Sequence, residues 1–301
     1  MRIRKPGKVC ERIWFLGREE SGVYLLVGNN CSMIVSGGMS YIISDILQQF
    51  KEFAIDENRI KKFLILHSHF DHVGIVPFMK RCHPEIEVYA SKRAWEILQM
   101  DRAILTINEF SRNVAQRMKK ENIYSAYDLE WRNDVSGKTA HEGDRIDLGG
   151  LEVSILEIPG HSSCCIAAYV PELKALFPTD GGGIPFNQTI ISSGNSNYTK
   201  YQQSLEKLKD LEVEVYGADH YGYLIGEEAR EFIHKSIEMA KKNRALIEQV
   251  YRSTQNIDVA VQKLVSSFYK ENPYYFLSPE ILLDVYRQTV RHIASVIERK
   301  A

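Results

Sequence analysis

The sequence predicts an α/β fold, in which strands and helices alternate before the chain ends in helices. Three observations support this prediction. Short β-branched runs come first, around residues 23–27 and 33–35, and the glycine pair Gly37 and Gly38 turns the chain after them. Apolar runs then alternate with helical patterns. Beyond residue 227 the apolar residues recur at helical spacing.

Both halves of the chain contribute elements to this pattern. In the first half we expect a helix over 42–53, a strand over 63–66, a helix beginning near Asp71 and a strand over 86–89. In the second half we expect strands over 151–158, 166–170, 175–177 and 213–216, with a helix over 198–211 before the last of them.

Two helical segments are added to the main domain, which spans residues 1–226. Residues 91–131 are charged and helix-prone, and their apolar residues are spaced for one face, which predicts an inserted helical cap. Residues 227–301 predict a C-terminal helical extension, whose last helix begins at Ser278 and Pro279. Residues 187–197 are rich in Ser, Asn and Gly and predict a long loop beside a pocket.

The composition limits the class of protein. With 301 residues, 44% of them hydrophobic, the chain can bury a large core, and its formal net charge of -1 gives no reason to expect nucleic acid or an anionic membrane as partner. The basic start of the chain is followed by no uninterrupted apolar stretch, so we expect no signal peptide or anchor. Five cysteines without paired metal-ligand spacing fit reduced thiols in a cytoplasmic protein.

The run from His67 to His72 carries the densest chemistry in the sequence. His67, His69, Asp71 and His72 follow an apolar run directly, which places three imidazoles and a carboxylate on one tight turn. These are the ligand types that zinc prefers. The alternative is a solvated turn in which Asp71 caps the following helix. That alternative accounts for the carboxylate but not for three imidazoles, so we predict a metal site.

Three further ligand-type residues follow later predicted strands. They are His161 after Gly160, Asp180 before Gly181, and His220 after Asp219. Each alone is a weak signal, because a single His or Asp near a strand end more often caps a turn or bonds within a loop. Together they converge on one edge of a sheet.

The order His-x-His-x-Asp-His, then Gly-His, then Asp, then His resembles the dinuclear metallo-β-lactamase superfamily. Residues 142–151 leading into 159–162 resemble the same superfamily. The likeness covers about residues 9–226 and implies a four-layer αββα sandwich with two metals at one end of its sheets. The inserted helical cap and the C-terminal helical extension are additions to that sandwich.

The resemblance also implies a role for each ligand. His67, His69 and His161 would hold the first metal, Asp71, His72 and His220 the second, and Asp180 would bridge both. Asp71, Asp180 and His220 are accordingly the predicted catalytic residues. Two divalent ions are expected, with zinc as the first choice and iron or manganese as alternatives, because imidazole and carboxylate ligands accept all three.

Two positions depart from the family pattern. Ser36 stands where many members have an Asp before the glycine turn, and Ala218 and Asp219 precede His220 where Pro-Gly is commoner. Residues that hydrogen-bond to metal ligands orient those ligands. The departure at Ser36 is therefore expected to change how the ligands are held.

The ligand set implies hydrolysis by a metal-bridging hydroxide that attacks a carbonyl or phosphorus atom. Thioesters suit such a site because a thiolate leaves without prior protonation. Tyr221 and Tyr223 are secondary candidates for binding an oxyanion, although packing is the commoner role of aromatic residues beside such a turn. Cys164 and Cys165 begin an apolar run and are expected to be buried strand cysteines rather than ligands.

Among superfamily members, the tail and cap resemble thioesterase-type proteins such as the quinolone-signal response protein. The acidic Asp180 argues against a β-lactamase, and His69 and the chain length argue against the oxygen-reducing and nucleic-acid-processing branches. The expected partner is an anionic or acyl small-molecule substrate, with oligomerisation through the terminal helices or cap left open. A lactone hydrolase, a phosphodiester hydrolase and a signalling protein with residual activity remain the alternatives.

Overall fold

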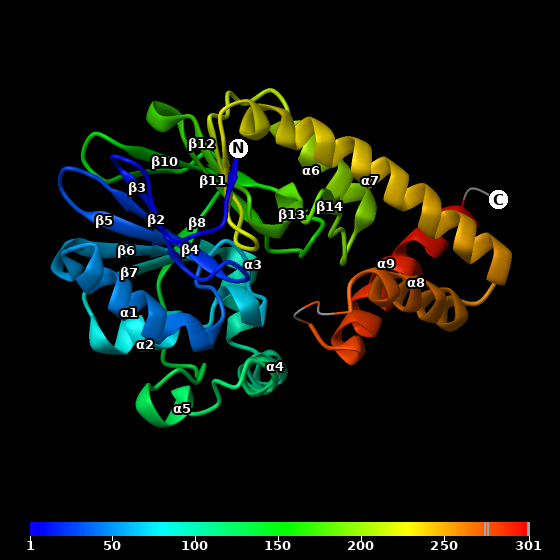
Figure 1. Ribbon diagram of the computed structural model, residues 1–301, viewed down its shortest axis with the longest axis horizontal. Helices are drawn as coiled ribbons and strands as arrows, with labels where there is room; N and C mark the ends of the chain where they lie inside the picture. Colours follow the sequence, from blue (N-terminus) through cyan, green and yellow to red (C-terminus); the bar gives the residue numbers. More distant parts are fainter. Residues whose placement is uncertain (274, 276, 300–301) are drawn as a thin grey trace.

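The computed structural model describes residues 1–273, 275 and 277–299. Two seven-stranded sheets face one another, and helices cover the outer face of each (Figure 1). Helices α1 (Ile43–Glu52) and α3 (Lys92–Leu98) pack against the first sheet, whereas α7 (Glu227–Thr254) packs against the second. This αββα arrangement confirms the fold class that the sequence predicted.

The first sheet is built from the N-terminal part of the chain in sequence order. Its strands are antiparallel up to β5 and parallel from β5 to β8, where helices make the connections. They are β2 (Gly7–Cys10), β3 (Ile13–Gly17), β4 (Gly22–Val27), β5 (Ser32–Val35), β6 (Ile60–Leu64), β7 (Glu87–Ser91) and β8 (Lys138–Ala140). Helix α2 (Val76–Cys82) lies between β6 and β7 in the chain.

The second sheet joins the two ends of the sandwich domain. Its order is β1-β16-β15-β12-β11-β10-β9, and β12 and β15 run parallel with α6 (Tyr198–Leu208) between them in the chain. The strands are β1 (Arg2–Ile3), β9 (Arg145–Asp147), β10 (Glu152–Glu157), β11 (Ile166–Val170), β12 (Ala175–Phe177), β15 (Val215–Gly217) and β16 (Tyr223–Ile225).

An apolar core fills the space between the sheets. Met33, Leu64, Ile155 and Phe177 are fully buried members of one hydrophobic cluster to which both sheets contribute. The ring of Phe177 lies 4.9 Å from that of Tyr24 across the two sheets. Because strands such as β4 and β5 are buried along nearly their whole length, they read as continuous apolar runs rather than as alternating patterns.

The predicted cap region contains α3, α4 (Asp101–Arg117) and α5 (Ile123–Ala126). Helix α3 belongs to the sandwich because it packs on β7 and β8, so α4 and α5 project beyond it (Figure 1). The indole N–H of the buried Trp131 donates to the backbone oxygen of Leu98 at 2.9 Å, which fixes the end of this region against α3.

The C-terminal extension consists of α7, α8 (Ile257–Glu271) and α9 (Pro279–Glu298), which pack on one another beside the sandwich (Figure 1). The Ser278 side chain accepts a hydrogen bond from the Ile281 backbone, and Pro279 is the first helical residue, as the sequence predicted. Arg117 at the end of α4 donates to the backbone oxygen of Tyr275 at 3.0 Å, which joins the cap to the extension. Among the described residues, every helix is too short or too polar to span a bilayer.

Two predicted elements differ from the structure. The segment at Asp71 is a single 3-10 turn, η3 (Phe70–His72), and the helix begins only at Val76. The backbone N–H groups of Gly74 and Ile75 donate to the backbone oxygens of residues 38 and 37, so they do not form helical hydrogen bonds. Residues 187–197 are not all loop, since β13 (Ile184–Phe186) and β14 (Thr189–Ile191) pair as a hairpin that turns at Asn187, where φ is +48°.

Candidate metal centre

The seven predicted ligands all lie just beyond strand ends at one edge of the sandwich. His67 and His69 follow β6, and His161 follows β10. Asp71 and His72 form part of η3, Asp180 lies in the 3-10 turn η5 (Thr179–Gly182) after β12, and His220 follows β15. The two sheets therefore deliver side chains from across the chain to one place, and all seven are buried or nearly so.

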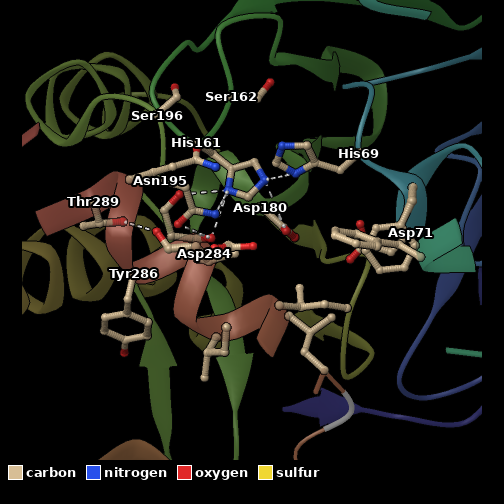
Figure 2. Close-up of a pocket in the computed structure, with 18 of the residues that line it drawn as sticks. His69, Asp71, His161, Ser162, Asp180, Asn195, Ser196, Asp284, Tyr286 and Thr289 are labelled. Carbon is tan, nitrogen blue, oxygen red and sulfur yellow. Dashed lines mark hydrogen bonds and ion pairs between the residues drawn. The ribbon is translucent and has the colours of Figure 1, made fainter. Parts of the chain in front are cut away.

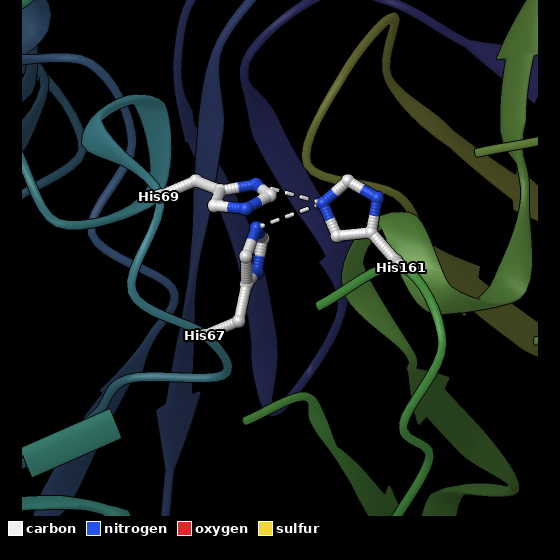
Figure 3. A group of neighbouring side chains, drawn as sticks. All are labelled: His67, His69 and His161. Atoms are coloured by element: carbon white, nitrogen blue, oxygen red, sulfur yellow. Dashed lines mark hydrogen bonds between the residues drawn. The ribbon is translucent and has the colours of Figure 1, made fainter. Parts of the chain in front are cut away.

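The first group comprises His67, His69 and His161 (Figure 3). His161 Nε2 lies 3.2 Å from His67 Nε2 and 2.9 Å from His69 Nδ1. Three ring nitrogens from two sheets thus point at one shared spot.

The second group comprises Asp71, His72 and His220. His220 Nε2 lies 3.2 Å from His72 Nε2 and 3.5 Å from Asp71 Oδ2. The carboxylate of Asp180 stands between the two groups, with Oδ2 3.5 Å from His161 Nε2 and 3.4 Å from His72 Nε2. Its Oδ1 faces His220 Nε2 at 3.7 Å, so one side chain reaches both groups.

Backbone and side-chain acceptors hold the outer nitrogens of three rings. His161 Nδ1 lies 2.8 Å from the Ser193 backbone oxygen, His220 Nδ1 lies 2.7 Å from that of Glu20, and His72 Nδ1 lies 2.8 Å from Asp219 Oδ2. An imidazole that donates outward from Nδ1 presents the lone pair of Nε2 inward. This is the arrangement in which metal-binding histidines are held.

These residues fit divalent cations. Inward-facing nitrogen lone pairs repel one another unless a cation lies between them, and Asp180 Oδ1 is buried without a hydrogen-bond partner among the described residues. Buried charges are normally paired or coordinate a metal. The donor set of imidazole nitrogens and carboxylate oxygens suits Zn, Fe and Mn.

A cavity of about 550 Å³ opens above the ligands (Figure 2). His69, Asp71, His161, Asp180 and His220 line its inner end. Helices α4 and α9 form much of its wall, together with the segment 191–196, which confirms that the predicted loop region borders a pocket. The cavity size lies within the range of about 300–1,000 Å³ that is usual for small-molecule sites.

Comparison with known proteins agrees with this geometry. A family model described as the metallo-β-lactamase superfamily matches residues 16–220. The chain belongs to this superfamily. The matched residues begin in β3 and end at His220, so they include all seven predicted ligands.

Solved structures of superfamily members share the fold. A metallo-β-lactamase family protein from Thermus thermophilus aligns over 98% of this chain and 96% of its own, with 16% identity and a TM-score of 0.69. An archaeal member from Sulfolobus tokodaii aligns over 76% of this chain and 86% of its own, with 20% identity and a TM-score of 0.59.

Curated relatives match a shorter part of the chain. The hydroxyacylglutathione hydrolase GloC of Haemophilus influenzae is 27% identical over 158 residues, which are 50% of this chain and 65% of that protein. The matches to two other hydroxyacylglutathione hydrolases cover 35% and 50% of their lengths. The chain thus spans less than two thirds of each of these superfamily relatives.

Burial and charge shape the protonation of the cluster. Burial lowers the pKa of His67, His161 and His69, in the last case to about 3, so these rings are neutral and can act as ligands. Burial opposes ionisation of Asp71 and Asp180, but His72 and His220 in their cationic form outweigh it and lower the pKa of both carboxyls. Burial likewise opposes protonation of these two rings, but Asp71 and Asp180 outweigh it and raise the pKa of His72 and His220. Both carboxylates are therefore charged at neutral pH.

Two residues that were not predicted to belong to the site contact its ligands. Asp219, noted as a departure from the superfamily pattern, lies directly behind His72. Thr179 was not singled out, although it adjoins Asp180 in sequence. Its hydroxyl lies 3.1 Å from His67 Nδ1 and donates to Asp219 Oδ2 at 2.6 Å.

The secondary candidates fall outside the cavity lining. The Tyr221 ring packs edge-on against Phe186 at 4.9 Å, and the Tyr223 ring lies 5.6 Å from Phe15 between the sheets. Both positions fit the packing role that the sequence favoured. Cys164 and Cys165 are buried, as expected, but they precede β11 rather than lying in it, with Cys164 Sγ 2.9 Å from the hydroxyl oxygen of Ser162.

Proposed function

We propose that this protein is a metal-dependent hydrolase that cleaves thioesters. The observation that supports this most directly is the convergence of five imidazoles and two carboxylates at the floor of a small-molecule cavity. Distant relatives bear the name of hydrolases of hydroxyacylglutathione, an acyl group carried on a thiol.

Each ligand has a defined part in this proposal. His67, His69 and His161 would hold one divalent ion, Asp71, His72 and His220 would hold the other, and Asp180 would serve both, with zinc the first choice of metal and iron or manganese the alternatives. Bound divalent ions supply a water molecule that is activated at neutral pH and a Lewis acid that polarises a carbonyl oxygen.

The cavity favours a substrate whose leaving group needs no proton. Apart from the predicted ligands, its described titratable lining residues are Arg102, Tyr275, Asp284 and Tyr286. Burial raises the pKa of Tyr275, and that of Tyr286 to about 12, which makes both weak acids. Asp284 is exposed and paired with Arg287. An alkoxide or amide leaving group would need an acid at this place, whereas a thiolate does not.

The test is hydrolysis of acyl and aryl thioesters by the purified protein. His69→Ala should lower kcat/KM at least about 100-fold, because one metal loses a ligand. His234→Ala changes an exposed histidine of α7 and serves as the matched control. Unchanged turnover in His69→Ala would discard the mechanism. Faster hydrolysis of lactones or phosphodiesters than of any thioester would replace the proposed substrate class.

A further inference from the structure

We propose that the cavity receives an apolar acyl group of the substrate, and that α4 and α9 select this group by its size. This inference rests on the proposed thioester hydrolysis and specifies its substrate class. It differs from the hydroxyacyl group in the names of the curated relatives.

Apolar side chains from both added helical segments form the outer wall of the cavity. Helix α4 contributes Ala103, Ile107 and Phe110, and helix α9 contributes Leu282 and Val285. Further apolar lining comes from Ile247 of α7 and Phe268 of α8. The wall that faces the ligands is thus built by segments that lie beyond the two sheets, and it presents aliphatic and aromatic surface to the cavity.

The polar lining falls into two parts. Four polar lining residues of α4 and α9 are exposed, namely Arg102, Thr106, Asp284 and Gln288, and a second polar part lies beside His161. Ser162 follows His161 in sequence, and Asn195 and Ser196 lie in the segment that holds the outer nitrogen of His161 (Figure 2). This polar side adjoins the first group of ligands. A substrate in the cavity therefore meets polar groups beside His161 and apolar groups along α4 and α9, so its own two ends must differ in polarity.

Two of the less exposed polar side chains along this wall have partners within the protein. The Thr289 hydroxyl donates to the Val285 backbone oxygen at 3.2 Å, and the Asn243 side chain donates to the Tyr198 hydroxyl at 3.1 Å. A hydroxyl or charge on the acyl group would lose water there without gaining an equivalent partner, which is costly. An aliphatic or aromatic acyl group has no such cost and gains from burial.

The cavity also sets an upper limit on the acyl group. Ala103 is only partly buried and lines the cavity from α4, and Val285 does so from α9. Larger side chains at these two positions would extend into the cavity and shorten it, while the ligands at its floor would remain in place. Leu105 lies on the same helix as Ala103, is 69% exposed and is absent from the described lining.

The experiment compares N-acetylcysteamine thioesters of acetyl, butyryl, hexanoyl and lactoyl groups on the metal-loaded protein. We expect kcat/KM to rise about fourfold per added methylene until the cavity is filled, and lactoyl to be poorer than butyryl. Ala103→Phe and Val285→Phe should lower the ratio of kcat/KM for hexanoyl to kcat/KM for acetyl at least about tenfold, since hexanoyl loses the burial of several methylenes and acetyl has none of them to lose.

The outcomes separate the two proposals. Measurable acetyl hydrolysis together with an unchanged Tm shows that each variant is folded, and Leu105→Phe should behave as wild type on every substrate. Hydrolysis that is equal for all acyl groups, or fastest for lactoyl, would overturn the apolar acyl site while leaving thioester hydrolysis intact. Failure to hydrolyse any of the four thioesters would instead overturn the proposed function, and the inference with it.

Discussion

The Ser36 hydroxyl donates a hydrogen bond of 3.0 Å to Asp219 Oδ2, although the two residues lie 183 positions apart. The same oxygen accepts from the Thr179 hydroxyl at 2.6 Å and lies 2.8 Å from His72 Nδ1. Ser36 follows β5 of the first sheet and Asp219 follows β15 of the second. The two departures from the family pattern therefore belong to one cluster, in which Asp219 supplies the carboxylate that Ser36 does not.

This cluster predicts that Asp219→Asn weakens metal binding. A carboxylate behind a ligating imidazole fixes its orientation and raises its basicity, and loss of such a partner typically costs about 10–100-fold in metal affinity. Titration of the metal-free protein against a coloured chelator measures the effect without any substrate. Asp210→Asn changes an exposed aspartate near the end of α6 and should bind metal as wild type does.

A paired exchange tests whether the carboxylate can be supplied from either side. The double variant Ser36→Asp with Asp219→Ser moves the carboxylate from residue 219 to residue 36. The side chains of these two residues are in hydrogen-bond contact in the wild-type protein. We expect it to recover at least half of the affinity lost in Asp219→Ser, on a logarithmic scale. No recovery, together with wild-type affinity in Asp219→Asn, would show that this carboxylate has no influence on the metal site.

Chelation should destabilise the protein. Metal that binds the folded state alone stabilises it by about 2.7 kcal/mol when its free concentration is 100 times its Kd. Removal by a chelator should therefore lower Tm, and added zinc should restore it. Asp180→Asn removes the charge that faces both ligand groups, so its Tm should respond less to chelator than that of wild type. An equal Tm with and without metal would contradict stoichiometric binding at the seven residues.

Acid should weaken a cross-strand cluster on the first sheet. Hydrogen bonds from Lys138 and then from Tyr89 lower the pKa of Glu87 from 4.5 to about 2. A depressed carboxyl pKa stabilises the fold above pH 4.5, and this contribution is lost as the pH falls towards 2. Glu87 is 39% exposed, so Glu87→Gln should cost only about 0.5–1 kcal/mol at pH 7.

Urea unfolding at pH 7 and pH 3 measures this difference. The difference in the free energy of unfolding between wild type and Glu87→Gln should be smaller at pH 3 than at pH 7. Tyr89→Phe removes the 2.9 Å hydrogen bond from the tyrosine hydroxyl to Glu87 and keeps the carboxylate and Lys138, so its loss of stability at pH 7 should be smaller than that of Glu87→Gln. A larger difference in the free energy of unfolding at pH 3 than at pH 7 would contradict a stabilising role for the ionised Glu87.

The alternation of strands and helices and the ligand cluster could be predicted from the sequence because both leave local signatures, whereas the αββα sandwich was implied by the resemblance to the superfamily. Buried strands such as β4 are continuous apolar runs, and His67 to His72 concentrate ligand-type residues in six positions. The sequence did not predict contacts that depend on tertiary packing. Asp219 stands out only as an unusual neighbour of His220, and its contact with Ser36 requires both sheets to be in place.

The predicted start of one helix was also wrong. Asp71 resembles a helix cap in sequence, but residues 37 and 38 take the backbone N–H groups of Gly74 and Ile75, so α2 begins at Val76. Likewise, a polar composition over 187–197 conceals the short strand β14, which is held by pairing with β13 rather than by its own propensity.

Gly160 shows how tertiary packing sets a ligand that local sequence only suggests. Its φ is +140°, and a Cβ there would lie 2.2 Å from the backbone nitrogen of Tyr201. Its backbone oxygen also accepts from the N–H groups of Ser196 and Asn197, at 3.1 and 3.0 Å. The adjoining His161 is therefore positioned by close contact between the turn after β10 and helix α6.

Gly160→Ala should accordingly destabilise the fold by about 3 kcal/mol or more, since both the backbone strain and the steric overlap must be relieved. It should also weaken metal binding, because the shift displaces His161. Gly143→Ala provides the matched control: φ is +83° there, but no atom lies within 4 Å of the added Cβ. That variant should cost only about 1–2 kcal/mol in urea unfolding and bind metal normally, because strain acts without steric overlap. Equal losses in the two variants would mean that the approach of Tyr201 does not determine the position of His161.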